Sequence, residues 1–314
     1  MKNCIICKNN KLDILTEQLR NSLPRKVFYC SHCQLGILEP KKLDVKKYYK
    51  TEYRKKYSDN LKTMDSSPKA MFELRKRFQN DRIGPLKKYF DNKKTLLEIG
   101  CSAGQFLVHV KKHFKKCTGI ELDTKCADFV EKKLDIKVYR KELEYCGLDE
   151  KSFDFIAAFQ VLEHTINPVK FLRDIRTYLK DNGKIFIEIP NLNDALLKIW
   201  PIKEHEKFFF HEAHTFYFTL KSLQIIFHKA GFKIELAHFT QDYNILNHLY
   251  WYFVNAPQPT PEFGLSRPHI EFSKNFPIVN KKINQLFQET DMKYKKILTD
   301  NKVTSNILII ASKK

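Results

Sequence analysis

The sequence predicts an α/β fold in which helices cover a mostly parallel sheet. Strand-like apolar runs alternate with amphipathic helical patterns between residues 70 and 240, and this alternation is typical of parallel sheets. A glycine-bearing turn at 100–104 follows the first of these runs, as expected where a strand ends and a helix begins. Two cysteine motifs precede the alternating region and predict a small additional module.

Length and composition set the limits of this interpretation. The chain has 314 residues, of which 43% are hydrophobic, so it can form one large domain with an appendage, or two domains. We expect no membrane span, because no apolar run reaches about 18 residues. The first residues, Met1-Lys2-Asn3-Cys4, lack the apolar core of a signal peptide. We therefore expect a cytoplasmic protein with reduced thiols.

The formal net charge of +20 permits two interpretations. A basic protein suits an anionic partner such as RNA, a nucleotide-linked substrate or a phosphorylated glycan. Abundant lysine spread along the whole chain explains the same charge without any functional role. The charge alone does not choose between them.

Two C-x-x-C motifs occupy the first 33 residues: Cys4 with Cys7, and Cys30 with Cys33. Each motif lets two thiolates converge on one ion, so the two together predict a tetrahedral four-cysteine zinc site. Four thiolates leave no open coordination position, and we therefore expect a structural zinc that supplies much of the folding energy of a module at 1–40. A pair of redox disulfides is the alternative.

Residues 41–92 are predicted to form a helical linker or lid. Tyr49, Tyr53 and Tyr57 recur at helical spacing within a basic stretch, and Tyr48 lies beside them. This stripe could cover a binding cleft, pack on its own domain or bind single-stranded nucleic acid. An amphipathic pattern from Met71 to Phe90 then predicts helices that cover an edge of the sheet.

The sheet itself is predicted from seven strand-like runs, which lie at 95–99, 117–121, 137–139, 153–159, 184–189, 232–239 and 306–311. Asn167-Pro168 provides an N-cap for a helix at 169–179, and Asn182-Gly183 is expected to end that helix. Thr219 can cap a helix at 221–229, which Gly231 stops. The main domain therefore spans 93–240 and 303–314. A helical insertion at 241–302 is expected to cover a substrate pocket or to form a dimer surface.

The turn after the first strand has the spacing E-x-G-x-x-x-G, with Glu98, Gly100 and Gly104. In an open α/β sheet, ligands bind beyond the carboxyl ends of the strands, where glycine lets a ligand approach the bare backbone. Glu121 ends the second strand, where a carboxylate can accept hydrogen bonds from both ribose hydroxyls of a nucleoside. Because no lysine is clearly directed at the turn, the pattern favours a nucleoside cofactor without phosphates.

The stretch Ser152–His164, S-F-D-F-I-A-A-F-Q-V-L-E-H, continues through Asn167-Pro168 and the Leu179–Lys184 turn into Ile189-Pro190-Asn191. Together with the E-x-G-x-x-x-G turn, this ensemble resembles the class I S-adenosylmethionine-dependent methyltransferases over residues 70–240 and the final strand. The one departure in the turn is Asn182 where glycine is usual, and asparagine also tolerates positive φ. The resemblance implies a Rossmann-like, mostly parallel seven-stranded sheet with an antiparallel last strand.

The same resemblance implies S-adenosylmethionine as cofactor and assigns residues to it. Four residues of the first turn would line the methionine and ribose side, Glu121 would hold the ribose with Leu122 beside it, two residues after the third strand would meet the adenine, and Gln160 would lie beside the sulfonium. The first-turn residues are Glu98, Gly100, Cys101 and Gly104, and the adenine residues are Glu142 and Leu143. For Glu98 and Gln160, ordinary hydrogen bonding within a turn is the alternative.

A histidine-rich element at 204–219 resembles the N-terminal-zinc methyltransferases that act on nucleotide-linked sugars. Those proteins carry a His-Glu-His…Tyr-Phe-Ser element near the substrate, which Ala213 interrupts in this chain. The resemblance implies that His211, Glu212 or His214 removes a proton from an oxygen or carbon nucleophile. The alternatives are a metal site formed by His205, His211 and His214, and a purely structural role for His214. His164 is interpreted as part of a structural turn.

The sequence therefore predicts methyl transfer from S-adenosylmethionine to a small anionic molecule, most simply a sugar that is nucleotide-linked or a surface-polysaccharide precursor. One alternative is an RNA methyltransferase whose zinc module binds nucleic acid. Another is a non-catalytic zinc-binding adaptor that retains the fold. The acceptor atom and the oligomeric state are not predicted.

Overall fold

The computed structural model describes residues 1–314 except 2, 41–64, 66, 201 and 273. Its centre is a sheet with the strand order β10-β11-β8-β7-β4-β5-β6. The seven strands are β4 (Asp91–Ile99), β5 (Phe114–Ile120), β6 (Val138–Tyr139), β7 (Phe153–Phe159), β8 (Leu179–Pro190), β10 (Phe232–Thr240) and β11 (Asn306–Lys313). Strand β11 runs antiparallel to both β8 and β10, whereas the pairs from β8 to β6 are parallel. The predicted fold class is confirmed.

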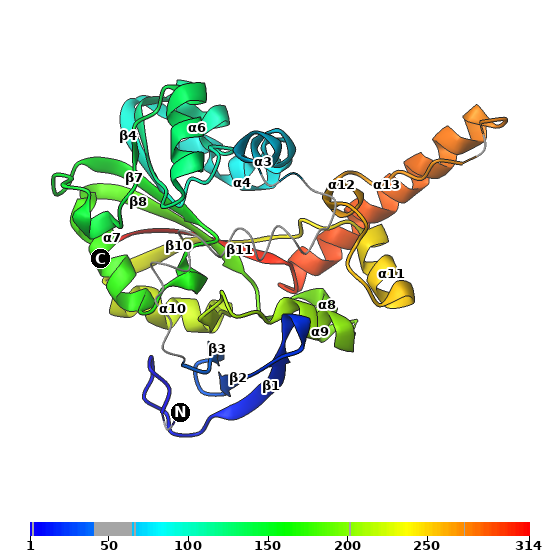
Figure 1. Ribbon diagram of the computed structural model, residues 1–314, viewed down its shortest axis with the longest axis horizontal. Coiled ribbons are helices and arrows are strands. Elements are labelled where there is room, and N and C mark those ends of the chain that lie inside the picture. The colour runs from blue at the N-terminus through cyan, green and yellow to red at the C-terminus, as the bar shows by residue number, and fades with distance from the viewer. Residues whose placement is uncertain (2, 41–64, 66, 201, 273) are drawn as a thin grey trace.

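Helices cover both faces of this sheet (Figure 1). Consecutive residues of a strand point to opposite faces, so Leu96 and Phe155 join one hydrophobic cluster, and Leu97 and Ile156 the other. The first face is covered by α3 (Pro68–Arg75), α4 (Asn80–Leu86), α5 (Leu107–Val110) and α6 (Thr124–Leu134), and the second by α7 (Pro168–Tyr178) and α10 (Leu220–Lys229). Three short 3-10 segments, η3 (Lys76–Phe78), η4 (Lys87–Tyr89) and η5 (Lys111–His113), extend helices of the first face.

Helix boundaries follow the predicted caps in two cases and depart from them in one. The Asn167 side chain accepts a hydrogen bond from the Lys170 N–H, and Thr219 forms a capping box at the start of α10. Helix α7 ends at Tyr178, however, because the chain at Leu179 already pairs with β7 as part of β8. Asn182 and Gly183 therefore lie within β8, and neither has a positive φ, so the predicted turn there is wrong.

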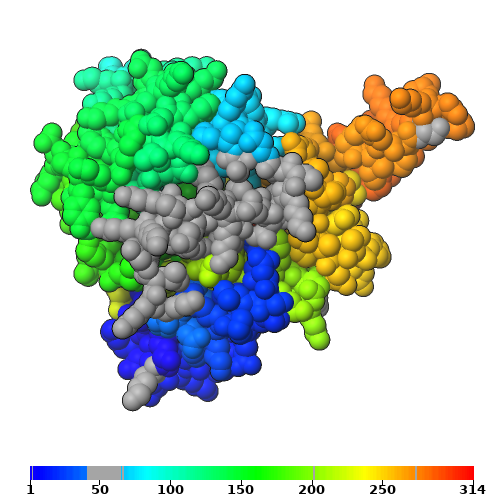
Figure 2. Space-filling model, viewed as in Figure 1, coloured from blue at the N-terminus to red at the C-terminus, as the bar shows by residue number. Residues whose placement is uncertain are grey.

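The segment predicted as an insertion contains three helices between β10 and β11: α11 (Ile245–Val254), α12 (Pro261–Leu265) and α13 (Pro277–Asp300). Helix α13 extends away from the body of the molecule (Figures 1 and 2), and Ile278, Leu286 and Met292 are exposed along it. In the C-terminal half of α13, Asp291 accepts a hydrogen bond from the Ile245 N–H, which ties α13 to α11. Among the described residues, no helix combines the length and apolarity that crossing a membrane requires.

A second sheet joins the N-terminal residues to the main domain. Its order is β1-β2-β3-β9, formed by β1 (Asp13–Leu19), β2 (Leu23–Cys30), β3 (Leu35–Leu38) and β9 (Phe216–Tyr217). Strand β9 lies between α9 (Lys203–Phe209) and α10, so the main domain contributes the last strand of the N-terminal sheet. Cys4, Cys30 and Ile37 also share a hydrophobic cluster with residues of β9 and α10. The tyrosine stripe at Tyr48, Tyr49, Tyr53 and Tyr57 lies outside the described residues.

Candidate functional site

A cavity of about 1530 Å³ opens at the carboxyl ends of the parallel strands. Ile99, Glu121 and Gln160 line it at the ends of β4, β5 and β7, and Asp242 and Lys295 line it from the segment between β10 and β11. Ordinary ligand pockets have volumes of about 300–1,000 Å³. The cavity therefore has room for a nucleoside cofactor and a second molecule together.

The turn after β4 forms one wall of the cavity. Gly100 lines it with φ +73°, a conformation that L side chains rarely adopt, and a Cβ here would lie 2.7 Å from Val161 Cγ2. Glu98 lines the cavity from the end of β4, and its Oε2 has no hydrogen-bond partner among the described residues. Burial raises the pKa of Glu98 well above its usual range and the Glu121 charge adds to this, while Arg82 opposes it. A cationic group of a ligand would therefore be well accommodated beside Glu98.

Two predicted cofactor residues lie off the cavity wall. Gly104 is not among the lining residues, and a Cβ at this position would lie 2.7 Å from Leu134 of α6. The absence of a side chain at Gly104 therefore makes room for α6 and not for a ligand. Cys101 is fully buried and its Sγ packs against Gly119 of β5, so its side chain belongs to the hydrophobic core. Neither residue lines the cavity, so their predicted contact with the cofactor stays a prediction.

Glu121 follows β5 directly and is held by two backbone donors. Its Oε2 accepts a hydrogen bond from the Ser102 N–H and its Oε1 from the Asp123 N–H, each at 2.8 Å. These bonds fix the carboxylate between the turns that follow β4 and β5. Leu122 lines the same cavity, as do Glu142 and Leu143. The structure thus brings the predicted ribose and adenine residues together on one wall.

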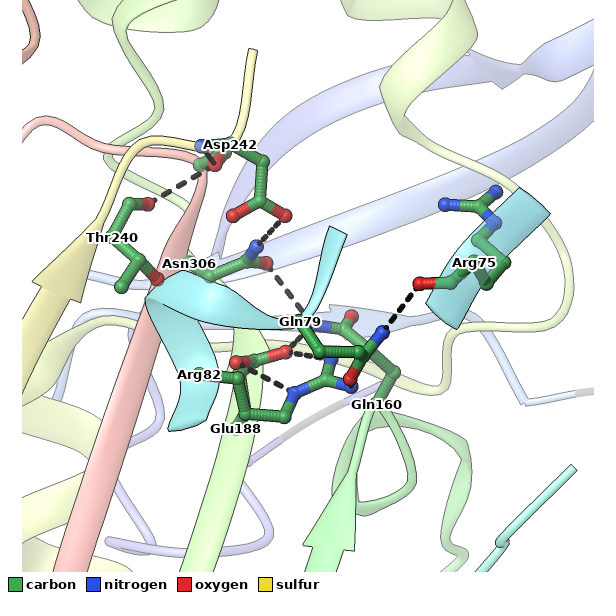
Figure 3. Close-up of polar contacts among 9 residues, drawn as sticks. Arg75, Gln79, Arg82, Gln160, Glu188, Thr240, Asp242 and Asn306 are labelled. Atoms are coloured by element: carbon green, nitrogen blue, oxygen red, sulfur yellow. Dashed lines mark hydrogen bonds and ion pairs between the residues drawn. The ribbon is translucent and has the colours of Figure 1, made fainter. Parts of the chain in front are cut away.

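Gln160 lies at the centre of a polar network that the sequence analysis did not anticipate (Figure 3). Its Nε2 donates to Glu188 Oε1 at 3.2 Å and to Asn306 Oδ1 at 3.0 Å. Glu188 also accepts from Arg82 Nε at 3.1 Å, which ties α4 to β8. The Asn306 Nδ2 donates to Asp242 Oδ2 at 2.7 Å. One chain of hydrogen bonds therefore joins β7, β8 and the two ends of the insertion.

Asp242 ends this chain on the cavity wall. Burial raises its pKa to about 7, with Glu188 adding to the effect, while Arg82 and Lys295 oppose it. The only sequence signal for Asp242 and Asn306 is their position, one directly after a predicted strand and the other at the start of the last one. Their contact depends on β10 and β11 pairing across the whole insertion, which the local sequence pattern does not show.

Of the three predicted catalytic residues, only His214 lines the cavity. His211 is buried behind it, with the two rings 3.8 Å apart between centroids, and Glu212 is also absent from the cavity wall. The reason is the loop geometry. The Tyr217 hydroxyl lies 2.9 Å from both the backbone N and the backbone O of His211, and this holds the loop closed. Burial lowers the pKa of His211 well below its usual range.

The residues that accompany His214 on the wall are Glu163 and His164, which follow β7. Glu163 Oε1 lies 3.9 Å from His214 Nε2 and 4.0 Å from His164 Nε2, and neither Glu163 oxygen has a hydrogen-bond partner among the described residues. His164 Nδ1 donates to the Ala213 carbonyl at 2.8 Å, which leaves its Nε2 toward Glu163. His164 therefore belongs to the cluster with Glu163 and His214 as well as to the turn.

Burial determines the protonation of these three side chains. It raises the pKa of Glu163 to about 8, lowers that of His164 to about 4 and lowers that of His214 well below its usual range. Near neutral pH the trio consists of a carboxylic acid and two neutral imidazoles. Such a group can exchange a proton with a bound substrate.

The same three side chains are also a potential metal site, because their ligand atoms all lie within 4.8 Å of one another. One carboxylate and two imidazoles suit a divalent transition metal. The ligand set considered from the sequence, His205, His211 and His214, is not the set that converges. His205 instead packs edge-on against Trp251, with the ring centroids 4.9 Å apart.

The four N-terminal cysteines also converge. Cys4 Sγ lies 3.6 Å from Cys33 Sγ, and Cys7 Sγ lies 3.4 Å from Cys30 Sγ, with all four sulfurs within 4.8 Å of one another. These distances are far longer than the about 2.05 Å of a disulfide, and the four cysteines are free. With Zn–S bonds of about 2.3 Å, a tetrahedral site separates its sulfurs by about 3.8 Å. The four-cysteine cluster therefore fits a zinc ion.

Comparison with known proteins agrees with this site. Residues 69–237 match the family model described as a methyltransferase domain. The chain belongs to this methyltransferase family. Membership of this family favours the methyltransferase interpretation over the non-catalytic adaptor considered above.

Three curated relatives cover part of the domain. A ubiquinone biosynthesis O-methyltransferase of Coxiella burnetii is 26% identical over 122 residues, which are 35% of this chain and 52% of the relative. The (S)-coclaurine N-methyltransferase of Papaver somniferum is 27% identical over 42% of this chain and 37% of its own length. An uncharacterised protein of Methanocaldococcus jannaschii is 30% identical over 44% and 63%. The chain thus spans about half the length of the curated relatives it matches.

Solved structures show the same fold. An S-adenosylmethionine-dependent methyltransferase of Archaeoglobus fulgidus has a TM-score of 0.51 at 20% identity and covers 84% of this chain and all of its own. The putative methyltransferase in a complex with the Haloferax volcanii Trm112 activator has a TM-score of 0.52 at 11% identity, over 83% and 96%. At these identities the likeness concerns the fold alone.

Proposed function

We propose that this methyltransferase transfers a methyl group from S-adenosylmethionine to a small-molecule acceptor that binds between Gln160 and His214. The observation that carries the proposal is the single cavity lined both by the strand-end residues and by the Glu163–His164–His214 trio. Its volume of about 1530 Å³ suits a donor and an acceptor side by side. Holding both in one cavity supplies the alignment that an in-line displacement needs.

The residues of the strand ends suit the cofactor. S-adenosylmethionine supplies an activated methyl group on a sulfonium. Glu121, fixed by two backbone N–H groups, would accept hydrogen bonds from the ribose hydroxyls. Leu122, Glu142 and Leu143 would enclose the adenine side, and Gly100 lets the backbone approach the ligand. Glu98 would face a cationic group of the cofactor, and Gln160 would lie near the methyl group that is transferred.

The trio would handle the proton of the nucleophile. His214 is neutral near pH 7 and lies on the wall, so it can take a proton from a hydroxyl or an acidic carbon of the acceptor. The resulting imidazolium would lie 3.9 Å from Glu163 Oε1, and its charge would lower the pKa of that carboxyl. Glu163 lines the cavity and would then release its proton to solvent, so that its carboxylate balances the imidazolium. His211 would hold the His214 ring in place through their contact. An amine acceptor would need only its neutral lone pair.

Several features support a small and anionic acceptor. The matched curated relatives are named for a ubiquinone intermediate and for coclaurine, which are small molecules. Arg267 lines the cavity from the insertion and would attract an anion, whereas Lys295 on the same wall already lies 3.8 Å from Asp291 Oδ2. The histidine-rich element at 204–219 favours a sugar, either nucleotide-linked or a polysaccharide precursor. RNA is the second candidate, on the strength of the +20 net charge.

A radiolabelled-methyl assay across nucleotide sugars, glycans, small phenols and amines, and RNA tests the proposal. We expect label in a small molecule and a large loss of rate for His214→Asn, because the asparagine cannot accept the proton. RNA binding would weaken steeply with salt, since phosphate contacts release counterions. Label that enters only RNA, with such a salt dependence, would replace the proposed acceptor class.

A further inference from the structure

We propose that the four-cysteine cluster positions the histidine loop, defined as residues 210–215, and so controls the acceptor side of the cavity. The effect on rate rests on the function proposed above, whereas the coupling itself rests on contacts between the two segments. The N-terminal module would then act on catalysis through the loop and leave the cofactor side unchanged.

The first contact is the pairing of β3 with β9. Gly36 pairs with Tyr217 and Ile37 with Phe216, and the Leu38 N–H donates to the Thr215 carbonyl at 2.9 Å. Strand β9 directly follows the histidine loop, so β3 holds the loop at its C-terminal end. The approach is close, because a Cβ on Gly36 would lie 2.9 Å from Tyr217 Cβ. Any larger side chain at this position would force the two strands apart.

The second contact comes from the cysteine motif itself. Gln34 follows Cys33 with φ +58°, and its N–H donates to the Cys30 carbonyl at 2.7 Å. The Gln34 carbonyl accepts a hydrogen bond from Thr219 Oγ1 at 3.0 Å. Because Thr219 caps α10, the turn that carries two of the thiols is attached to the start of that helix. A change in the conformation of this turn would therefore affect the residues that precede and follow β9.

A third contact holds the other end of the histidine loop. The Arg20 N–H, between β1 and β2, donates to the Phe210 carbonyl at 2.7 Å. Arg20 Nε donates to the Phe208 carbonyl at 2.6 Å, and the guanidinium lies over the Phe208 ring. The module therefore contacts the chain immediately before and after His211–His214. Loops with fixed ends have less conformational freedom and open less often.

The loop passes this constraint to the catalytic trio. The Thr215 N–H donates to the Glu163 carbonyl at 2.8 Å, and the Ala213 carbonyl accepts from His164 Nδ1. The hydrogen bonds that fix Glu121, in contrast, come from Ser102 and Asp123. Release of β3 from β9 should therefore loosen the trio and leave the ribose carboxylate in place.

The thiols are needed because the module is small. Its strands are short, and Cys4, Cys30 and Cys33 are buried in a core that it shares with β9 and α10. In modules of this kind, metal binding supplies folding energy, so the loss of one thiol ligand disorders the turns that carry the cluster. Those turns include Gln34 and lead directly into β3.

Two variants distinguish the role of the β3–β9 contact from the role of the four-cysteine cluster. Gly36→Val keeps all four thiols and pushes β3 away from β9, with Gly36→Ala as the milder form, and Cys30→Ser removes a thiol. Cys117→Ser, the same exchange at a buried position of β5, is the matched control. Each is measured by hydrogen exchange of peptides covering 210–217, by zinc content, by calorimetric binding of S-adenosylhomocysteine and by methyl transfer.

We expect Gly36→Val to keep its zinc and to exchange at least about tenfold faster over 210–217, because local opening sets the exchange rate. Cys30→Ser should lose zinc and show the same faster exchange. In both, cofactor binding should stay within about twofold and methyl transfer should fall by about tenfold or more, whereas Cys117→Ser should leave exchange over 210–217 unchanged. Unchanged exchange in Cys30→Ser that has lost its zinc would overturn the role of the cluster, and unchanged exchange in Gly36→Val would overturn the coupling through β3 and β9. Faster exchange with an unchanged rate would instead remove the role assigned to His214.

Discussion

Glu163 shows how position in the fold changes the chemistry of an ordinary residue. It follows β7 in a turn, yet it is almost fully buried and faces two imidazoles instead of solvent. Burial raises the pKa of Glu163 and lowers the pKa values of His164 and His214. The trio therefore disfavours both a negative carboxylate and a positive imidazolium. A charge that a substrate introduces there would be shared among the three.

Glu163→Gln tests the protonation of this carboxyl. The side chain has a pKa of about 8 in the folded protein against 4.5 as the reference, so between these values the unfolded state binds fewer protons and stability falls as pH rises. From pH 6.5 to 8 the wild type should lose about 1.6 kcal/mol relative to the glutamine variant, because the slope of about 1.4 kcal/mol per pH unit halves as pH reaches the folded pKa. Urea denaturation measures this difference. The histidines titrate in the unfolded state near their reference pKa of 6.5, but both proteins share this change and it cancels in the comparison. Parallel curves would contradict the assignment.

Glu121→Ala tests the ribose role. The substitution removes the carboxylate that two backbone N–H groups orient, and hydrogen bonds to a charged group contribute about 1.5–3 kcal/mol each. Affinity for S-adenosylmethionine should fall at least about tenfold by calorimetry. Glu150→Ala, at an exposed position off the cavity wall, is the control and should bind normally. Full affinity in Glu121→Ala would show that the ribose is held elsewhere.

At the level of elements, the sequence predicted the central sheet well because its strands are continuous apolar runs. Strand β7 has the predicted bounds, 153–159, whereas β8 begins five residues earlier than predicted because Leu179 already pairs with Phe153, before a register shift that leads to Lys184. The strands β1 to β3 and β9 were not predicted. Strand β9 has two residues and no pattern of its own, and it exists because β3 pairs with it.

The same reasoning explains which site residues could be found from the sequence. Glu121 and Gln160 end strands, and the carboxyl ends of parallel strands meet at one edge. The pairing of His214 with Glu163 depends on how the histidine loop docks, and Asp242 meets Asn306 only after the insertion is closed. Contacts of this kind join distant segments, which local periodicity does not encode.

Arg82→Met tests how α4 is attached to the sheet. Arg82 pairs with Glu188 of β8, and the two side chains are 18% and 5% exposed. Removing the arginine leaves a buried carboxylate without its partner, which costs about 3–5 kcal/mol in comparable pairs. Chemical denaturation should show this loss, and the double variant Arg82→Met with Glu188→Gln should recover part of it. Equal stability of the single and double variants would show that the pair is not coupled.

At the level of the whole molecule, the cavity is lined by the strand ends, the histidine loop and the insertion, and also by residues of α3, η3 and α4. The first binds the proposed cofactor, the second carries the proposed proton acceptor, and the third supplies Asp242, Arg267 and Lys295. The proposed cover by residues 241–302 agrees with this lining. Specificity for the acceptor should therefore change with the insertion more than with the strand ends.

Metal analysis tests the first segment of the chain. We expect about one zinc per chain, and its removal by a chelator should lower the Tm by at least about 5 °C, equivalent to about 2 kcal/mol for a domain of this size. Cys146→Ala leaves the four-cysteine cluster intact and should keep the metal. A second equivalent that disappears in His214→Ala would instead place a metal at the trio. A metal-free protein with bridged N-terminal cysteines would refute the zinc site.

The shared sheet also limits how this protein can be recombined. Because β9 completes the sheet of β1 to β3, the described residues of the N-terminal module and of the main domain share one sheet. In a chimera that takes residues 1–40 from a homologue, the residues that contact Tyr217 and Thr219 would come from a different protein. Such a chimera should fold only when residues 208–219 come from the same homologue as the module. The two segments are far apart in sequence, yet they should be inherited together.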